Sequence, residues 1–260
     1  MRVLHVSPHP DDELVGAPAT LMALRDAGHE VVNLALSLGR PDDHDRRRAE
    51  VEEACRRARI GLAITEPPIA MSASDDRADA EERVRWQLSM ALNGAEPPDL
   101  VVGPSPHDVH QAHELTGRAI REVLAARDDP PPWWIWAIWG DLPFPTVIAV
   151  FDDERQAEIA DALSAHAGEM TRADHRLHVD SRSKLTAVTA AEKVFGFGAP
   201  ALATARAEVV TEVVREDGAW KLGVPRTLSA ADPLARPSSR RVDSWINSPS
   251  PRDLAGGPLD

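Results

Sequence analysis

The stretch VLHVSPHPDDE, residues 3–13, decides how the rest of the chain can be interpreted. It begins with a short apolar run at 3–6, and the prolines that follow cannot continue a strand. Acidic residues then open an apolar-periodic segment that ends at Gly28, which is typical of a helix. The stretch therefore predicts a strand, a short loop and a helix at the start of the chain.

The same alternation continues along the sequence. Further apolar runs predict strands over 31–36, 98–103, 133–139, 146–151 and 207–214. Helical patterns lie over 45–59, 81–93, 113–127, 154–170 and 183–194. Strands that alternate with helices favour an α/β fold, in which helices cover both faces of a mostly parallel sheet.

The chain is expected to form one catalytic domain over residues 1–227. After that point Ser, Pro, Arg, Gly and Asp dominate and periodic apolar positions are lacking, so residues 228–260 are expected to be a flexible tail.

The composition excludes several classes of protein. A chain of 260 residues with 43% hydrophobic residues can bury a sizeable core. Its net charge of -13 argues against binding to nucleic acid or to an anionic membrane surface. No apolar run approaches the ~18 residues of a membrane span, and the first residues lack the pattern of a signal peptide. The single cysteine, Cys55, is expected to be a structural thiol, and a cytoplasmic location is predicted.

Two loops carry the residues that are best suited to catalysis or metal binding, and both follow predicted strands. The first holds His9, Asp11 and Asp12, and the second, 103–113, holds three histidines. In open α/β sheets ligands bind at the carboxyl ends of the strands, so both loops are expected at one edge of the sheet. Acidic residues at a helix start are often simple caps and loop histidines are often solvated, but two such loops together favour a functional site.

The spacing of these residues suits a metal ion. His9 and Asp12 lie three residues apart, which lets both side chains face one point. A catalytic zinc ion is typically held by three protein ligands and keeps one position open. The third ligand could come from His107, His110 or His113. Neither loop contains cysteine, so a closed thiolate site is excluded.

The run HPDDE at 9–13, followed by LVG, resembles the signature of the PIG-L/LmbE-like deacetylases. The second loop, HQAH at 110–113, resembles the later His-Pro-Asp-His motif of that family, and AEKVFGFG at 191–198 is similar to a segment of some members. The resemblance covers residues 1 to about 215. It implies a Rossmann-like fold, dependence on zinc and N-acyl amino-sugar substrates.

Carried onto this chain, the resemblance implies that His9, Asp12 and His113 bind zinc. It also implies that Asp11 is the general base and that His110 helps to stabilise the transition state. The expected reaction is zinc-dependent hydrolysis of an N-acyl group, chiefly acetyl, from a small amino sugar or glycoconjugate. Natural-product biosynthesis is a setting that would suit this reaction.

The chain departs from the family pattern in two ways. Gln111 and Ala112 replace the Pro and Asp of the second motif, and the lost carboxylate could have oriented a histidine. Asp108 could take over that role. The chain also has no tyrosine, so an oxyanion would have to be stabilised by zinc, His110 or backbone N–H groups.

Two alternative functions remain open from the sequence. One is an amidase that acts on thiol conjugates of the mycothiol type, and the other is a metal-binding protein without catalytic activity. A dinucleotide-binding module is disfavoured because the first loop lacks the G-x-G-x-x-G pattern. The sequence does not set the oligomeric state.

Other parts of the chain offer weaker signals. The tryptophans of 133–139 and the loop 67–79 are the best candidates for walls around a substrate, although core packing is the more common role of such tryptophans. His166, His175 and His178 lie in a polar region and are assigned no role.

Overall fold

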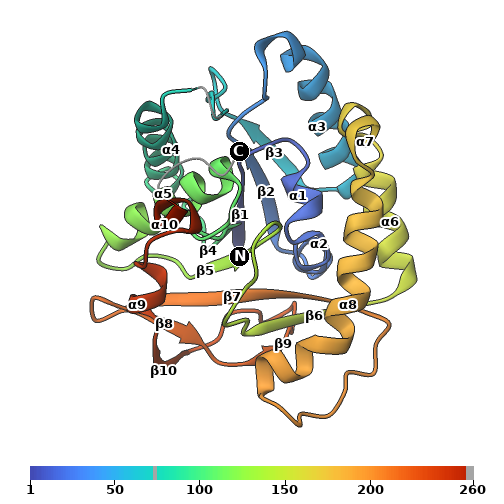
Figure 1. Ribbon diagram of the computed structural model, residues 1–260, viewed down its shortest axis with the longest axis vertical. Coiled ribbons are helices and arrows are strands. Elements are labelled where there is room, and N and C mark those ends of the chain that lie inside the picture. Colours follow the sequence, from blue (N-terminus) through green and yellow to red (C-terminus); the bar gives the residue numbers. More distant parts are fainter. Residues whose placement is uncertain (73–74, 256–260) are drawn as a thin grey trace.

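The computed structural model describes residues 1–72 and 75–255 (Figure 1). Its strands are, in chain order, β1 (Arg2–Ser7), β2 (Glu30–Ala35), β3 (Gly61–Ile64), β4 (Leu100–Pro104), β5 (Trp133–Trp136), β6 (Val147–Phe151), β7 (Arg206–Glu216), β8 (Ala219–Gly223), β9 (Arg226–Thr227) and β10 (Pro237–Arg241). Its helices are α1 (Asp12–Val15), α2 (Pro18–Asp26), α3 (His44–Ala58), α4 (Arg77–Leu92), α5 (Gln111–Ala125), α6 (Asp153–Leu163), α7 (Ala167–Arg172), α8 (His175–Phe195), α9 (Asp243–Ile246) and α10 (Pro251–Ala255), with a short 3-10 turn at Pro41–Asp43.

The parallel part of the sheet has the strand order β5-β4-β1-β2-β3. Each neighbouring pair in this part runs parallel, as the predicted alternation of strands and helices requires. The chain moves outward from β1 to β2 and β3, then returns to the other side of β1 at β4. The gap between β1 and β4 is therefore the topological switch point, where open α/β sheets bind their ligands. The predicted Rossmann-like fold is confirmed.

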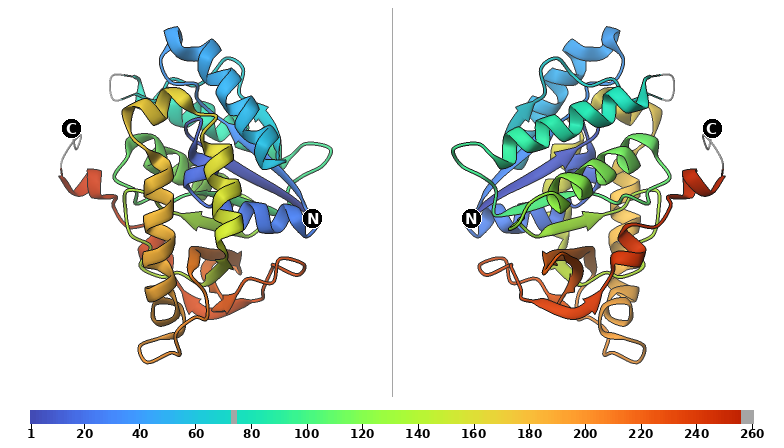
Figure 2. Two further views of the ribbon diagram at one scale, coloured as in Figure 1. Left: turned by 90° about the vertical axis from the view of Figure 1, so that its right-hand side faces the viewer. Right: turned by 90° about the vertical axis from the view of Figure 1, so that its left-hand side faces the viewer.

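Helices cover both faces of the sheet (Figure 2). On one face, apolar residues of α2, α3, α6 and α8 pack in a single buried cluster. On the other face, α4 and α5 build a second cluster together with residues near α9. Within the described residues, no helix is long and apolar enough to cross a membrane.

Beyond β5 the sheet becomes antiparallel. The long strand β7 pairs with β5 through 211–213 and with β6 through 206–210. β8 and β10 extend the sheet further in antiparallel fashion. This region lies far from the switch point in the strand order, so it supports the sheet and does not carry the two loops.

The segment after residue 228 differs from the expected flexible tail. β10 pairs with β8, and Ile246 of α9 is fully buried in the cluster that contains α4 and α5. Val242, Trp245 and Ile246 have the i, i+3, i+4 spacing of a helix, but they span only about one turn, and all three pack in or against this cluster. Residues 256–260 lie outside the described part. The division into a catalytic domain over 1–227 and a tail remains a prediction.

The helices after β6 also differ from expectation. A single helix was predicted over 154–170, but the chain turns at 164–166 and continues as α7. The next helix begins at His175, eight residues before the predicted start at 183. At this turn His166 is buried, and its ring contacts a buried glutamate at the start of α1.

Candidate active site

The two loops expected to carry chemistry meet at the switch point. β1 and β4 lie side by side with Leu4 opposite Val101, so the segments that leave their carboxyl ends are neighbours. The first segment runs through His9 into α1, and the second runs into α5, whose first turn holds His113. A Cβ on Gly117 would lie 2.6–2.7 Å from backbone atoms of residues 104–106, so glycine lets α5 pack closely against the loop.

Asp12 lies between two histidines. Its Oδ2 is 3.3 Å from Nδ1 of His9, and its Oδ1 is 3.2 Å from Nε2 of His113. One ring nitrogen each of His9, His110 and His113 lie within 4.8 Å of one another. Imidazole nitrogens and a carboxylate gathered in this way form a donor set suited to a divalent transition metal.

Asp108 contacts the ring nitrogen of His113 that does not face Asp12. Its Oδ2 lies 3.3 Å from Nδ1 of His113 and also accepts hydrogen bonds from the N–H groups of Ile138 and Trp139. Burial alone would lower the pKa of His113, but Asp12 and Asp108 on its two sides raise that pKa to about 10. A carboxylate on the far nitrogen of a histidine is the usual way to orient a metal ligand, so Asp108 occupies the position that was open in the sequence.

Ala112 occupies the position of the family's aspartate, and its surroundings do not suit a carboxylate. Its side chain is fully buried among the apolar residues that α5 presents to the core. A carboxylate at this position would be buried without a partner. Asp108, five residues before His113, is the carboxylate that contacts the His113 ring.

Asp11 adopts an unusual backbone conformation, with φ 115° and ψ -24°. Its N–H donates to Oε2 of Glu13, and Oε1 of Glu13 contacts Nε2 of His166 at 2.7 Å. Glu13 and His166 are both fully buried, so this pair fixes the turn from the interior. Burial and the neighbouring charge of Asp12 raise the pKa of Asp11 well above its ordinary value.

His110 lies at the open side of the group. Its ring is 4.8 Å from the ring of His9 and 4.8 Å from the ring of His113, measured between centroids. Partial removal from water and the two neighbouring imidazoles lower its pKa to about 3, so its ring is neutral at neutral pH. His107, the third histidine of this loop, instead packs against Trp245 and does not join the group.

These residues surround a cavity of about 140 Å³. Besides the two loops, its lining comes from α3, from the loop after β5 and from α7 and α8: His9, Asp11, Asp12, Val15, Arg47, His110, His113, Ile138, Trp139, Glu169, Arg172 and His175. Sequence reasoning missed the last three of these residues and also His166. The three histidines of 166–178 were the available signal, but nothing local showed that this segment returns to the first loop.

Arg47 ties helix α3 to the site. Its Nη2 donates to the carbonyl of Pro10 at 3.1 Å, and its Nη1 lies 3.2 Å from Oε1 of Glu169. It therefore links the first loop to α7. The Arg47 side chain is largely covered, whereas those of Arg46 and Arg48 on the same helix are more exposed.

The tryptophans divide into two groups. Trp133, Trp134 and Trp136 are fully buried, and Trp136 packs edge-to-face with the His113 ring at 5.3 Å between centroids. Trp139 is half exposed, lines the cavity and packs against His178. Of the expected walls, only Trp139 borders the cavity, and the described residues of the loop 67–79 do not.

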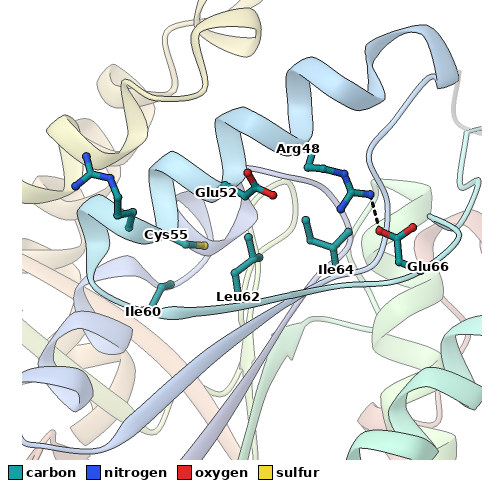
Figure 3. Close-up of a pocket in the computed structure, with 8 residues that line it drawn as sticks. Arg48, Glu52, Cys55, Ile60, Leu62, Ile64 and Glu66 are labelled. Carbon is teal, nitrogen blue, oxygen red and sulfur yellow. Dashed lines mark hydrogen bonds and ion pairs between the residues drawn. The ribbon is translucent and has the colours of Figure 1, made fainter.

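A larger groove of about 490 Å³ lies between α3 and β3 (Figure 3). Its floor holds Cys55 and Leu62, and Arg48 pairs with Glu66 at 2.6 Å on its rim. Burial raises the pKa of the Cys55 thiol, which suits a structural residue. This groove contains none of the histidines of the two loops.

Fold and site together define an α/β protein with a histidine–aspartate group at the switch point of its sheet. Residues 4–124 match the family model described as "PIG-L: GlcNAc-PI de-N-acetylase". Residues 4–124 thus match this family model, and the resemblance found in the motifs is confirmed. No curated protein sequence matches the chain.

Several solved structures share the fold. A teicoplanin deacetylase in its zinc-inhibited form is 16% identical, with 84% of this chain and 99% of that chain covered and a TM-score of 0.61. N,N'-diacetylchitobiose deacetylase from Pyrococcus horikoshii is 18% identical, with coverage of 81% and 83% and a TM-score of 0.56. The 4-carboxy-2-hydroxymuconate hydratase from Pseudomonas putida KT2440 is 16% identical, with coverage of 83% and 97% and a TM-score of 0.60. The fold therefore serves more than one reaction, and function must be argued from the site.

Proposed function

We propose that this protein is a zinc-dependent hydrolase that removes an N-acyl group, chiefly acetyl, from an amino sugar or glycoconjugate. The observation that carries the proposal is the position of Asp12 between His9 and His113, with Asp11 buried next to it. The description of the matching family and the names of two similar structures, both deacetylases, support the same reaction.

The residues present fit a zinc ion. His9, Asp12 and His113 would hold it, which leaves a position open for water or substrate. Asp108 orients His113, so the donor set already has its supporting carboxylate. When bound, zinc would supply Lewis-acid polarisation of the amide carbonyl and lower the pKa of a bound water.

Asp11 is the proposed general base. It accepts a proton from the attacking water as the water oxygen bonds to the carbonyl carbon, and it passes that proton to the amine when the C–N bond breaks. Its raised pKa brings the carboxylate closer to the range that proton transfer near neutral pH requires. The contact between Glu13 and the Asp11 N–H holds this side chain in its strained turn.

His110 is proposed to stabilise the developing negative charge on the carbonyl oxygen. Its ring stands at the open side of the group and is neutral, so it can donate one N–H to that oxygen. Ala112 stands where the family motif has an aspartate, so we propose no carboxylate partner that would hold a proton on the His110 ring.

The size of the cavity bears on the substrate. Its volume of about 140 Å³ is smaller than the ~300 Å³ of the smallest typical ligand pockets, so it suits an acyl group and part of one sugar ring. The rest of the substrate would then extend past Trp139, whose exposed ring can stack on a sugar or an apolar group. We therefore propose that an N-acetylglucosaminyl conjugate is preferred to the free sugar.

The test is a panel of N-acetylated amino sugars, free and conjugated, incubated with the protein and added zinc. Release of acetate and the free amine is measured, and a His9→Ala variant serves as the control. A thiol conjugate in the same panel tests the amidase alternative. Metal binding without turnover of any amide would favour a non-catalytic metal-binding protein and would overturn the proposal. Equal kcat/KM for free and conjugated sugars would remove only the preference for conjugates.

A further inference from the structure

A second group of potential metal ligands shares the wall of the same cavity. One carboxylate oxygen each of Asp11 and Glu169 and one ring nitrogen of His175 lie within 4.8 Å of one another. The three residues come from the turn after β1, from α7 and from the first position of α8. None of them belongs to the proposed ligand set of His9, Asp12 and His113.

His175 contributes a buried imidazole to this group, in addition to the two carboxylates. Its side chain is only 6% exposed and lines the cavity. Its Nε2 is buried and has no hydrogen-bond partner within the described residues. A buried ring nitrogen without a partner is costly, and a cation bound beside Asp11 and Glu169 is one species that would satisfy it.

Two arginines next to Glu169 affect how tightly this group could bind a cation. Nη1 of Arg47 lies 3.2 Å from one oxygen of Glu169, and Nη2 of Arg172 lies 3.0 Å from the other. They hold the carboxylate in place, but their positive charges oppose a cation. Binding here should therefore be weaker than at His9, Asp12 and His113, where the described residues place no arginine on the Asp12 carboxylate.

We propose that Asp11, Glu169 and His175 form a second, weaker site for a zinc-like divalent cation, and that filling this site inhibits the enzyme. Inhibition follows because a cation on the Asp11 carboxylate takes the lone pairs that would accept the proton of water. The inhibitory effect rests on the proposed function, whereas the binding itself does not.

The experiment measures zinc bound per chain by equilibrium dialysis as free zinc is raised. The wild-type chain should bind one ion at low zinc and a second at higher zinc. His175→Ala should keep the first step and lose the second, whereas His178→Ala, one turn along the same helix and outside the group, should keep both. Arg172→Ala removes one exposed opposing charge and should tighten the second step by up to about fivefold.

Glu169→Gln provides a second variant in case His175→Ala does not fold, and the near-UV circular dichroism of the buried tryptophans reports folding in each case. This variant should also lose the second step, and excess zinc should no longer inhibit it. A wild-type chain that never binds more than one ion, or a second ion that persists in both His175→Ala and Glu169→Gln, would overturn the inference. Absence of turnover with every substrate would instead count against the proposed function, because the number of bound ions is measured without substrate.

Discussion

Two adjacent arginines of α3 line different cavities, and the two cavities differ in size and chemistry. Arg47 reaches the cavity of about 140 Å³ between the two loops, while Arg48 reaches the groove of about 490 Å³ beside β3. The larger groove is floored by apolar residues and Cys55, and Arg48 pairs with Glu66 on its rim. The smaller one gathers histidines and carboxylates from several elements of the fold.

The difference teaches that position in the sheet marks the site better than volume does. The small cavity lies where β1 and β4 end, so two loops of different sequence origin converge there. The groove lies against the edge strand β3 and is lined by one helix and one strand that are neighbours in the sequence. Asp11 and His113, which line the small cavity, each have a raised pKa.

The largest expected effect comes from His113→Ala. It removes a proposed ligand and leaves Asp12 and Asp108 facing an empty position. We expect loss of the tightly bound metal and of detectable hydrolysis, measured by metal content after dialysis and by amine release. His107→Ala is the matched control, since it changes a histidine of the same loop that packs against Trp245. Full metal occupancy in His113→Ala would remove this residue from the ligand set.

Asp11→Asn should have the next largest effect. Asparagine tolerates the positive φ of this turn, so the backbone should keep its shape while the proton acceptor is lost. Turnover is expected to fall by roughly 10²–10⁴-fold, with the first metal ion retained. Steady-state kinetics and metal analysis on the same sample check both parts. Turnover near that of the wild type would show that another group takes the proton.

The two loops were predictable because their signals are local. His9 and Asp12 are spaced for one face of a turn, and the histidines of the second loop follow a buried strand. Their convergence was expected because both loops follow strands of an open α/β sheet, in which ligands bind at the carboxyl ends of the strands. The supporting role of Asp108 was left open, because a sequence does not show which carboxylate reaches the far nitrogen of His113.

The opposite wall of the cavity was not predictable by the same reasoning. His166, Glu169 and His175 follow the first loop by more than 150 residues, and they reach it only because the chain turns between α6 and α7. Helical periodicity records which face is apolar, but it does not record which distant segment a polar face will meet. The packing of 228–255 was not visible in the sequence for a related reason, since Val242 and Ile246 lie within a single helical turn and yet are buried.

Asp108→Asn tests whether the supporting network belongs to the site. The amide keeps the shape of the side chain but removes the charge next to His113 and weakens the acceptor for Ile138 and Trp139. Metal affinity or turnover should fall by about 10–100-fold, the usual effect of losing such a partner. A chelator competition assay gives the affinity, and Asp141→Asn in a nearby exposed loop is the control. An unchanged affinity and turnover would mean that Asp12 and His9 orient His113 unaided.

The smallest effects are expected from two neighbouring variants, one at the small cavity and one at the groove beside β3. Arg47→Gln removes the donor to Pro10 and the partner of Glu169, so turnover should fall by about tenfold through loss of support for the first loop. Arg48→Gln breaks only the solvent-exposed pair with Glu66, so turnover should stay unchanged and the free energy of unfolding should change by no more than about 0.5 kcal/mol. Both variants make the same chemical change one residue apart on α3, so general damage to the helix would affect them alike. Kinetics and urea unfolding measure the two effects, and a loss of turnover in Arg48→Gln as large as that in Arg47→Gln would mean that the groove beside β3 takes part in the function.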